Sequence, residues 1–255
     1  MGPLRRSLRA ALRAIFVALV LTTPALAREE PAEPFEEIEF FQAAGAVGHL
    51  ILPAGAPDRR TAAIVILQDT LGPDGRAALY VDQLLGAGLA VLELVEAGGA
   101  DLGALVNALG AHPRILEGQL DLLGLGAGAQ AAAGWPGRVR ARALLYPGCA
   151  AQLPADMPGE AVLLIHGDAD APHAGAACQQ LATRLGATAA QVQRRVLAGV
   201  GYAWDRPGFV GEGRSMVPAP DGSGHIAAAA NPGMAALSAT QVASFFATSL
   251  LTSTR

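Results

Sequence analysis

Short apolar runs recur along the chain from Val47 onward, and segments with apolar residues at helical spacing separate them. The runs scarcely alternate with polar residues and are bounded by Gly, Pro or Asp, a pattern typical of strands covered on both faces. They span Val47–Leu52, Ala62–Leu67, Leu89–Leu94, Leu120–Leu125, Ala143–Tyr146, Ala161–Ile165 and Val192–Leu197. The alternation predicts an α/β fold with a doubly wound, mostly parallel sheet in one domain.

The segments between these runs predict the helices that cover the sheet. They span Arg76–Leu85, Leu102–Leu109, Ala127–Ala133 and Ala174–Leu185, and a longer final helix covers Met234–Leu251. The segment Gly208–Pro232 is rich in Gly and Pro, so we expect it to be a surface excursion before the last helix.

The N-terminus has the order of a secretory signal peptide. Four arginines precede residue 14, an apolar run follows at Ile15–Leu21, and Ala25-Leu26-Ala27 supplies small residues for cleavage. The sequence therefore predicts a signal peptide over 1–27, an extension over 28–46 and a domain over 47–255, in a periplasmic or secreted protein. The alternative is an uncleaved membrane anchor, but the apolar run is about half the length that spans a bilayer. We expect no stable membrane insertion after cleavage.

Composition excludes several classes of function. Hydrophobic residues make up 52% of the chain, which excludes a disordered protein. The formal net charge is −4, and it becomes −8 when the leader is removed with its four arginines and no acid, so nucleic acid is excluded as a partner. All 18 basic residues are arginines. A P-loop, a Schiff-base lysine and a Ser-Lys dyad are excluded because each needs a lysine.

The two cysteines predict one disulfide in an exported chain. Cys149 follows the predicted strand Ala143–Tyr146, and Cys178 lies early in the helix after the next strand. If these strands are neighbours in a parallel sheet, both cysteines lie near its carboxyl edge, where they can pair. The alternative is two separate buried thiols.

A strand-to-helix turn at Gly124–Gly128 provides the main candidate for chemistry. Its sequence, Gly-Leu-Gly-Ala-Gly, has the frame of a nucleophile elbow, G-x-S-x-G, in which small residues allow a strained turn that exposes the central side chain. Here the central residue is Gly126, and no serine occurs between the leader and Ser215. The site has therefore lost its nucleophile or uses other chemistry.

Four segments in order resemble the dienelactone hydrolase family of α/β-hydrolases, and the similarity covers nearly everything from Val47 to the C-terminus. They are Gln68–Gly72 after a central strand, the elbow Gly124–Gly128, the H-G-x-x-D-like turn His166–Asp170 and the P-G-x-x-H-A-F-D-like turn Ala198–Asp205. The resemblance implies an α/β-hydrolase fold and an active-site order of elbow, acid and base.

The same resemblance assigns roles residue by residue. Asp170 takes the position of the triad acid, Gly126 that of the nucleophile and Tyr202 that of the histidine base. The backbone N–H groups of Thr70 and Ala127 take the oxyanion-hole positions, and Asp69 and His166 belong to the pocket. Because nucleophile and base are both replaced, the resemblance implies a catalytically degenerate protein that binds a small carboxylate, ester or lactone.

Other interpretations of these residues remain open. An active hydrolase would need displaced groups, with Asp69 or Asp170 activating water or with His166, His173 or His225 as base. Gly124–Ala129 also fits the dinucleotide fingerprint, although no acid ends the following strand to hold a ribose hydroxyl. The cluster His166, Asp168, Asp170 and His173 matches no known metal pattern. We expect neither a cofactor nor a metal.

Overall fold

The computed structural model describes residues 36–55, 58–96, 99–149, 159–207, 214–220 and 222–252. All of them belong to one compact unit that begins at Pro34. The predicted signal peptide, residues 1–27, and its cleavage site lie outside these ranges. Within the described residues, no helix combines the length and apolar character that a bilayer crossing requires.

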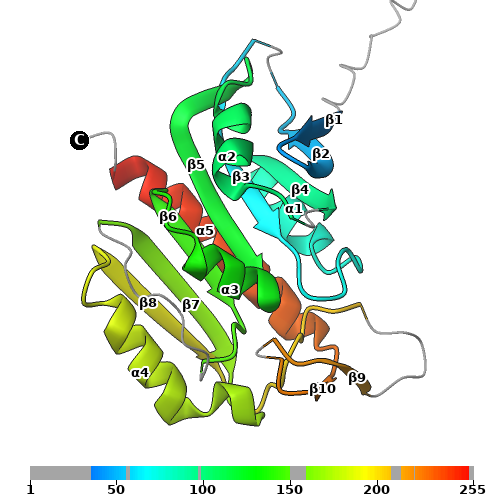
Figure 1. Cartoon of the computed structure of the whole chain (residues 1–255), viewed down its shortest axis with the longest axis vertical. Coiled ribbons are helices and arrows are strands. Elements are labelled where there is room, and N and C mark those ends of the chain that lie inside the picture. Colours follow the sequence, from blue (N-terminus) through cyan, green and yellow to red (C-terminus); the bar gives the residue numbers. More distant parts are fainter. Residues whose placement is uncertain are drawn as a thin grey trace, which may run out of the picture. The chain divides into compact units, whose positions relative to one another are not determined.

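A mostly parallel sheet of eight strands forms the centre of the unit (Figure 1). Its order is β1-β2-β4-β3-β5-β6-β7-β8, with β1 and β2 antiparallel to their neighbours and the rest parallel. The strands are β1 (Glu37–Ala43), β2 (Ala46–Leu52), β3 (Thr61–Leu67), β4 (Ala90–Glu96), β5 (Ile115–Leu125), β6 (Ala141–Leu145), β7 (Ala161–Gly167) and β8 (Gln191–Leu197). The seven predicted strands are therefore all present, within a few residues at their ends.

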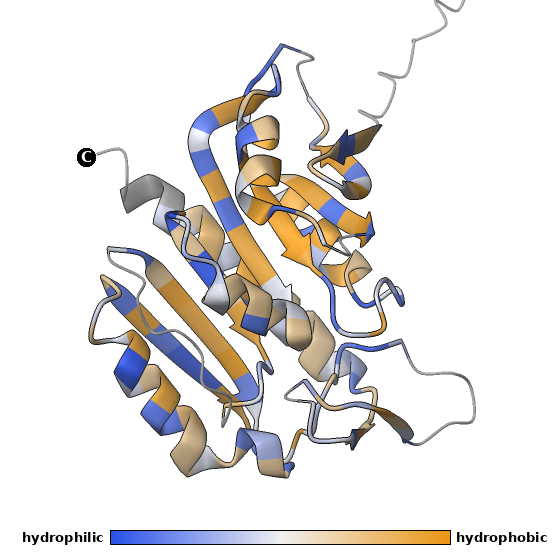
Figure 2. Cartoon of the chain, viewed as in Figure 1, coloured by the Kyte–Doolittle hydropathy of each residue, from blue (hydrophilic) through white to orange (hydrophobic). Residues whose placement is uncertain are grey.

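Helices cover both faces of the sheet because alternate strand residues point to opposite sides. α1 (Ala78–Gly86) and α5 (Pro232–Thr252) pack on one face, against β3 residues such as Ile64 and Ile66. α2 (Leu102–Gly110), α3 (Ala127–Gly134) and α4 (Gly175–Leu185) pack on the other face, which includes Val65 and Leu122. In Figure 2, β3 and β7 are almost wholly hydrophobic, whereas the first half of β5 and the edge strand β8 carry hydrophilic bands.

Two regions differ from the sequence-based expectation. Residues 37–43, assigned above to an extension before the domain, form β1 and pair with β2 along their full length. Ile38 and Phe40 lie on the exposed face of this edge strand and are 64% and 69% exposed, whereas Glu39 and Phe41 on the opposite face are half-buried. The excursion before α5 contains a small antiparallel sheet, β9 (Ser215–Pro218) and β10 (His225–Ala228).

The predicted disulfide is present. Cys149 and Cys178 are bonded, and both are buried. Cys149 lies just past β6 and Cys178 lies in the first turns of α4, so the bond ties the loop after β6 to the helix after β7. A short 3-10 turn, Ala171–His173, begins the same connection, and Cys149 N–H donates to the Pro172 carbonyl at 2.8 Å.

Candidate active site

The elbow is a sharp turn between β5 and α3. Gly126 has φ +55° and ψ −114°, a backbone conformation that disfavours any residue with a Cβ. Its N–H donates to the Leu145 carbonyl at 3.0 Å, and its carbonyl accepts from the N–H of Ala129 in the first turn of α3. The strained turn of a nucleophile elbow is thus formed around a residue without a side chain.

The flanking glycines allow α3 to lie directly against β3 and β5. A Cβ on Gly124 would collide with the backbone of Ala129, and one on Gly128 would collide with the carbonyl oxygen of Leu67. Close helix–strand packing therefore accounts for the Gly-x-Gly-x-Gly pattern. The dinucleotide interpretation receives no further support from this geometry, since the residue after β6 is Tyr146 rather than an acid.

Asp69 occupies the two backbone donors that the sequence assigned to the oxyanion hole. This residue follows β3, and its side chain is buried. Its Oδ1 accepts from Thr70 N–H at 2.8 Å and from Ala127 N–H at 3.0 Å. These two donors do converge on one point, as an oxyanion hole requires, and a carboxylate oxygen of the protein itself lies at that point.

The second oxygen of Asp69 has two further donors. Oδ2 accepts from the Tyr202 hydroxyl at 2.6 Å and from Nη1 of Arg76 at 2.9 Å. The carboxylate and the Tyr202 hydroxyl also fill the space into which a side chain on Gly126 would project, because an ideal Cβ there would lie well inside 3.0 Å of both. The nucleophile position therefore has neither a reactive atom nor room for one.

Tyr202 is held as a proton donor. Its ring is fully buried, makes an edge contact with Tyr146 at 5.1 Å between centroids, and stacks on His173 at 6.0 Å. Burial, and next the Asp69 carboxylate, raise the pKa of the Tyr202 phenol far above its ordinary value of about 10. The phenol stays protonated at neutral pH, so it cannot accept a proton as the base of a triad does.

Asp170 is paired with His173. Its Oδ1 accepts from His173 Nδ1 at 2.6 Å, and Gly148 N–H donates to His173 Nε2 at 2.9 Å. These partners assign the proton to Nδ1 and leave no lone pair of the imidazole free for catalysis. Asp170 Oδ2 is buried without a hydrogen-bond partner and lies 4.0 Å from an ideal Cβ on Gly201. The orphan oxygen thus lies near Gly201, the residue before the assigned base position.

A buried polar network extends from this site, and sequence reasoning missed it. Arg76 is 1% exposed, and Asp74 holds its guanidinium through Nε at 2.9 Å and Nη2 at 2.6 Å. Arg76 Nη1 also reaches the Tyr146 hydroxyl, which donates to Asp205, as does Tyr80. The only sequence signal was Asp74-x-Arg76 beside a predicted helix, and that pattern is common on exposed surfaces.

The remaining candidate residues do not join the site as reactive groups. His166 is buried, its Nδ1 lies 2.5 Å from the Gly167 carbonyl oxygen, and its Nε2 accepts from Arg194 Nε at 2.9 Å. Burial lowers the pKa of His166, which keeps the ring neutral. His225 begins β10, and its side chain is exposed. Among the described residues, no group of three His, Cys, Asp or Glu side chains is arranged to hold a metal ion.

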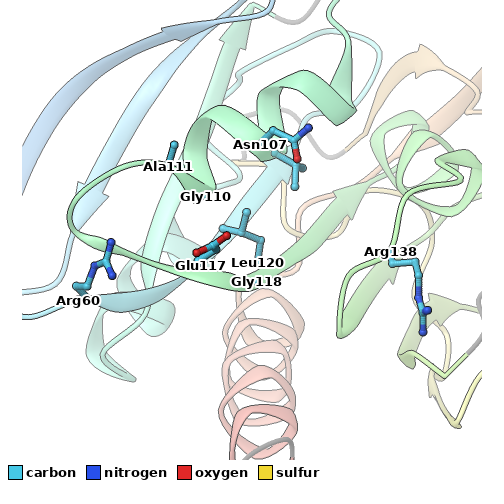
Figure 3. A pocket seen from close by; sticks show the side chains of 9 residues that line it. Arg60, Asn107, Gly110, Ala111, Glu117, Gly118, Leu120 and Arg138 are labelled. Atoms are coloured by element: carbon cyan, nitrogen blue, oxygen red, sulfur yellow. The ribbon is translucent and has the colours of Figure 1, made fainter.

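A cavity lined by described residues lies at the other end of the strands. Its volume is about 730 Å³, and it lies between the end of α2 and the first half of β5, with Arg60 and Arg138 among its lining residues (Figure 3). Arg60 precedes β3 and Arg138 precedes β6, so the cavity belongs to the amino ends of the strands. The elbow lies at the carboxyl end of β5, and neither Asp69 nor Tyr202 lines this cavity.

Comparisons with known proteins identify the fold. A hyperthermophilic esterase from the archaeon Pyrobaculum calidifontis is 13% identical with a TM-score of 0.61, over 85% of this chain and 87% of the esterase. Dienelactone hydrolase from Anabaena variabilis is 15% identical with a TM-score of 0.55, over 83% of this chain and 97% of the hydrolase. Puromycin hydrolase is 16% identical with a TM-score of 0.57, and this chain spans only 38% of its length.

No family model matches the sequence, and a search of the curated proteins finds no match. At such low identities, the similar structures establish architecture rather than activity. The chain has the α/β-hydrolase fold, in the form shared by dienelactone hydrolase and related esterases.

Proposed function

We propose that this chain is an exported, noncatalytic α/β-hydrolase-fold protein whose former active site holds a carboxylate instead of performing acyl transfer. One observation carries the proposal: the Asp69 carboxylate and the Tyr202 hydroxyl occupy the space and the donors that an acyl-enzyme would need. A covalent hydrolase requires a nucleophile, a base and an empty oxyanion hole. The assigned positions supply none of the three.

The alternative, a hydrolase with displaced catalytic groups, finds no support in the geometry of three of its candidates, Asp69, His166 and His173. Asp69 accepts five hydrogen bonds, of which the one from Thr70 Oγ1 is long at 3.5 Å, so the lone pairs of its carboxylate are taken. The Nε2 lone pairs of His173 and His166 are taken by Gly148 N–H and by Arg194. A general base needs a free lone pair within reach of the proton that it removes.

Export is the second part of the proposal. The basic, apolar and Ala-Leu-Ala order of residues 1–27 supports it, and a buried disulfide is compatible with an oxidising compartment.

A covalent probe tests the loss of catalysis. We expect a fluorophosphonate or a reactive lactone to leave the protein unlabelled, and an activated ester to be hydrolysed without an initial burst. Slow turnover alone would not decide the question, because hydrogen-bond donors alone can accelerate hydrolysis about 10³-fold over the rate in water. Stoichiometric labelling that peptide mapping places on a residue of this site would refute the proposal.

A constructive variant tests the assigned positions. Gly126→Ser and Tyr202→His restore the nucleophile and the base, and Asp69→Gly removes the carboxylate that would collide with the new serine. The unpartnered Oδ2 of Asp170 lies near Gly201, so it is the carboxylate oxygen available to an imidazole introduced at the next residue. We expect slow esterase activity in the triple variant and none when the serine or the histidine is omitted. Activity that does not depend on both residues would contradict the assignment.

A further inference from the structure

Four donors within 3.0 Å converge on one carboxylate, and they come from three segments of the chain. Thr70 N–H and Ala127 N–H bind one oxygen, and the Tyr202 hydroxyl and the Arg76 guanidinium bind the other, at 2.6–3.0 Å. This donor set resembles the sites that proteins build for carboxylate ligands: two backbone amides, one of them at a helix start, a hydroxyl and an arginine. The acceptor is unusual only in being part of the same chain.

The donors are held in place by contacts that do not involve Asp69. Ala127 is the first residue of α3, whose N-terminal dipole favours an anion. Arg76 is fixed by its three hydrogen bonds to the Asp74 carboxylate. Tyr202 is fixed by its ring contacts with Tyr146 and His173. The cradle should therefore persist when the Asp69 carboxylate is removed.

We infer that Asp69 is an intramolecular ligand that keeps a carboxylate-binding site closed, and that the site takes a small monocarboxylate when the Asp69 side chain is absent. The inference rests on the proposed function, because an active acyl-transfer site would need the same donors. Because the Asp69 carboxylate is tethered to the chain, its effective concentration at the site is high, and it excludes a free carboxylate that is present at millimolar concentration. Its removal leaves buried donors without acceptors, and satisfying them favours binding.

Ligand size follows from the atoms removed. Asp69→Ala deletes a carboxylate group, which leaves room for formate. Asp69→Gly deletes a methylene as well, which leaves room for acetate. In both variants a bound monoanion restores the local charge that Asp69 supplies beside Arg76, with Asp74 and Asp205 unchanged.

Titration of these variants with sodium formate and sodium acetate tests the inference, with sodium chloride at equal ionic strength as the salt control. The readouts are the melting temperature and the ¹⁵N–¹H shifts of the Thr70 and Ala127 amides. We expect Asp69→Ala to gain at least 3 °C in saturating formate and less in acetate, and Asp69→Gly to gain in acetate. Wild type should show no change at either amide.

Asp168→Ala is the matched control, since Asp168 also accepts a backbone N–H, from Gly199 at 2.6 Å, but lies at an exposed position. It should not respond to carboxylates. If Asp69→Ala does not fold in chloride, refolding in formate replaces the titration, and recovery only in formate supports the inference.

Three results would overturn the inference. They are a folded Asp69→Ala protein whose two amides ignore formate, an unfolded one that formate does not rescue, and a wild type that binds formate as tightly as the variant. None of them bears on covalent labelling, so the noncatalytic proposal would stand or fall separately.

Discussion

Replacing Gly126 with alanine tests how the elbow is filled. The alanine would keep the backbone conformation of Gly126, φ +55° and ψ −114°, which costs a residue with a side chain about 1–3 kcal/mol. It would also overlap the Asp69 carboxylate and the Tyr202 hydroxyl. Relieving such overlap by shifting packed groups costs a further ~1–3 kcal/mol. We expect the free energy of unfolding to fall by about 2–6 kcal/mol in total.

Two comparisons separate these contributions. Gly199→Ala also places a side chain at positive φ, +71°, but no atom lies within 4 Å of its Cβ. It should cost about 1–2 kcal/mol, from the backbone alone. Adding Gly126→Ala to a chain that already carries Asp69→Gly and Tyr202→Phe removes the overlapping atoms, so the alanine should then cost only the backbone strain. The expected coupling is about 1–3 kcal/mol.

Urea denaturation followed by circular dichroism measures each free energy, and thermal melts check them. For a domain of this size, the Gly126→Ala protein should melt about 5–20 °C below wild type. Equal costs of Gly126→Ala in both backgrounds would refute the conclusion that Asp69 and Tyr202 fill the nucleophile position. The same conclusion would be refuted if Gly126→Ala lowered the free energy of unfolding no more than Gly199→Ala does.

Three further predictions concern the rest of the molecule. Replacing both Cys149 and Cys178 with alanine should lower the free energy of unfolding by about 3–4 kcal/mol, because the disulfide closes a loop between residues 29 apart in the sequence. Urea denaturation measures the loss, and an unchanged midpoint would exclude that contribution. Asp121 is buried in β5 and is paired with Arg140. Burial raises the pKa of Asp121 to about 6, so the stability that its protonated form contributes is complete below its unfolded pKa of about 4 and is lost as the pH rises through 6. Relative to Asp121→Asn, the stability of wild type should therefore fall by up to about 3 kcal/mol between pH 4 and pH 7, and parallel pH profiles would contradict this. Intact-mass analysis of exported protein should find Arg28 as the first residue, and a retained Met1 would reject the predicted signal peptide.

The sequence by itself determined the order of the elements. Unalternating apolar runs at Ala62–Leu67 and Leu120–Leu125 can be buried on both faces only within a covered parallel sheet, and both runs lie in central strands. The disulfide was also predictable, because parallel neighbouring strands bring their carboxyl ends to one edge. β1 was harder to predict, since an edge strand with one exposed face carries a weaker apolar signal.

The resemblance to dienelactone hydrolases also assigned Gly126, Asp170 and Tyr202, in chain order, to the positions of nucleophile, acid and base, and it assigned Thr70 and Ala127 as paired donors. It did not show that Asp69 fills those donors, because their partner depends on where a side chain after β3 meets the start of α3, 58 residues later. The burial of Arg76 was equally invisible, since Asp74-x-Arg76 looks the same on a surface as in a core. Local patterns record which backbone a segment adopts, whereas the occupant of a site is decided by contacts between distant segments that only the packed fold brings together.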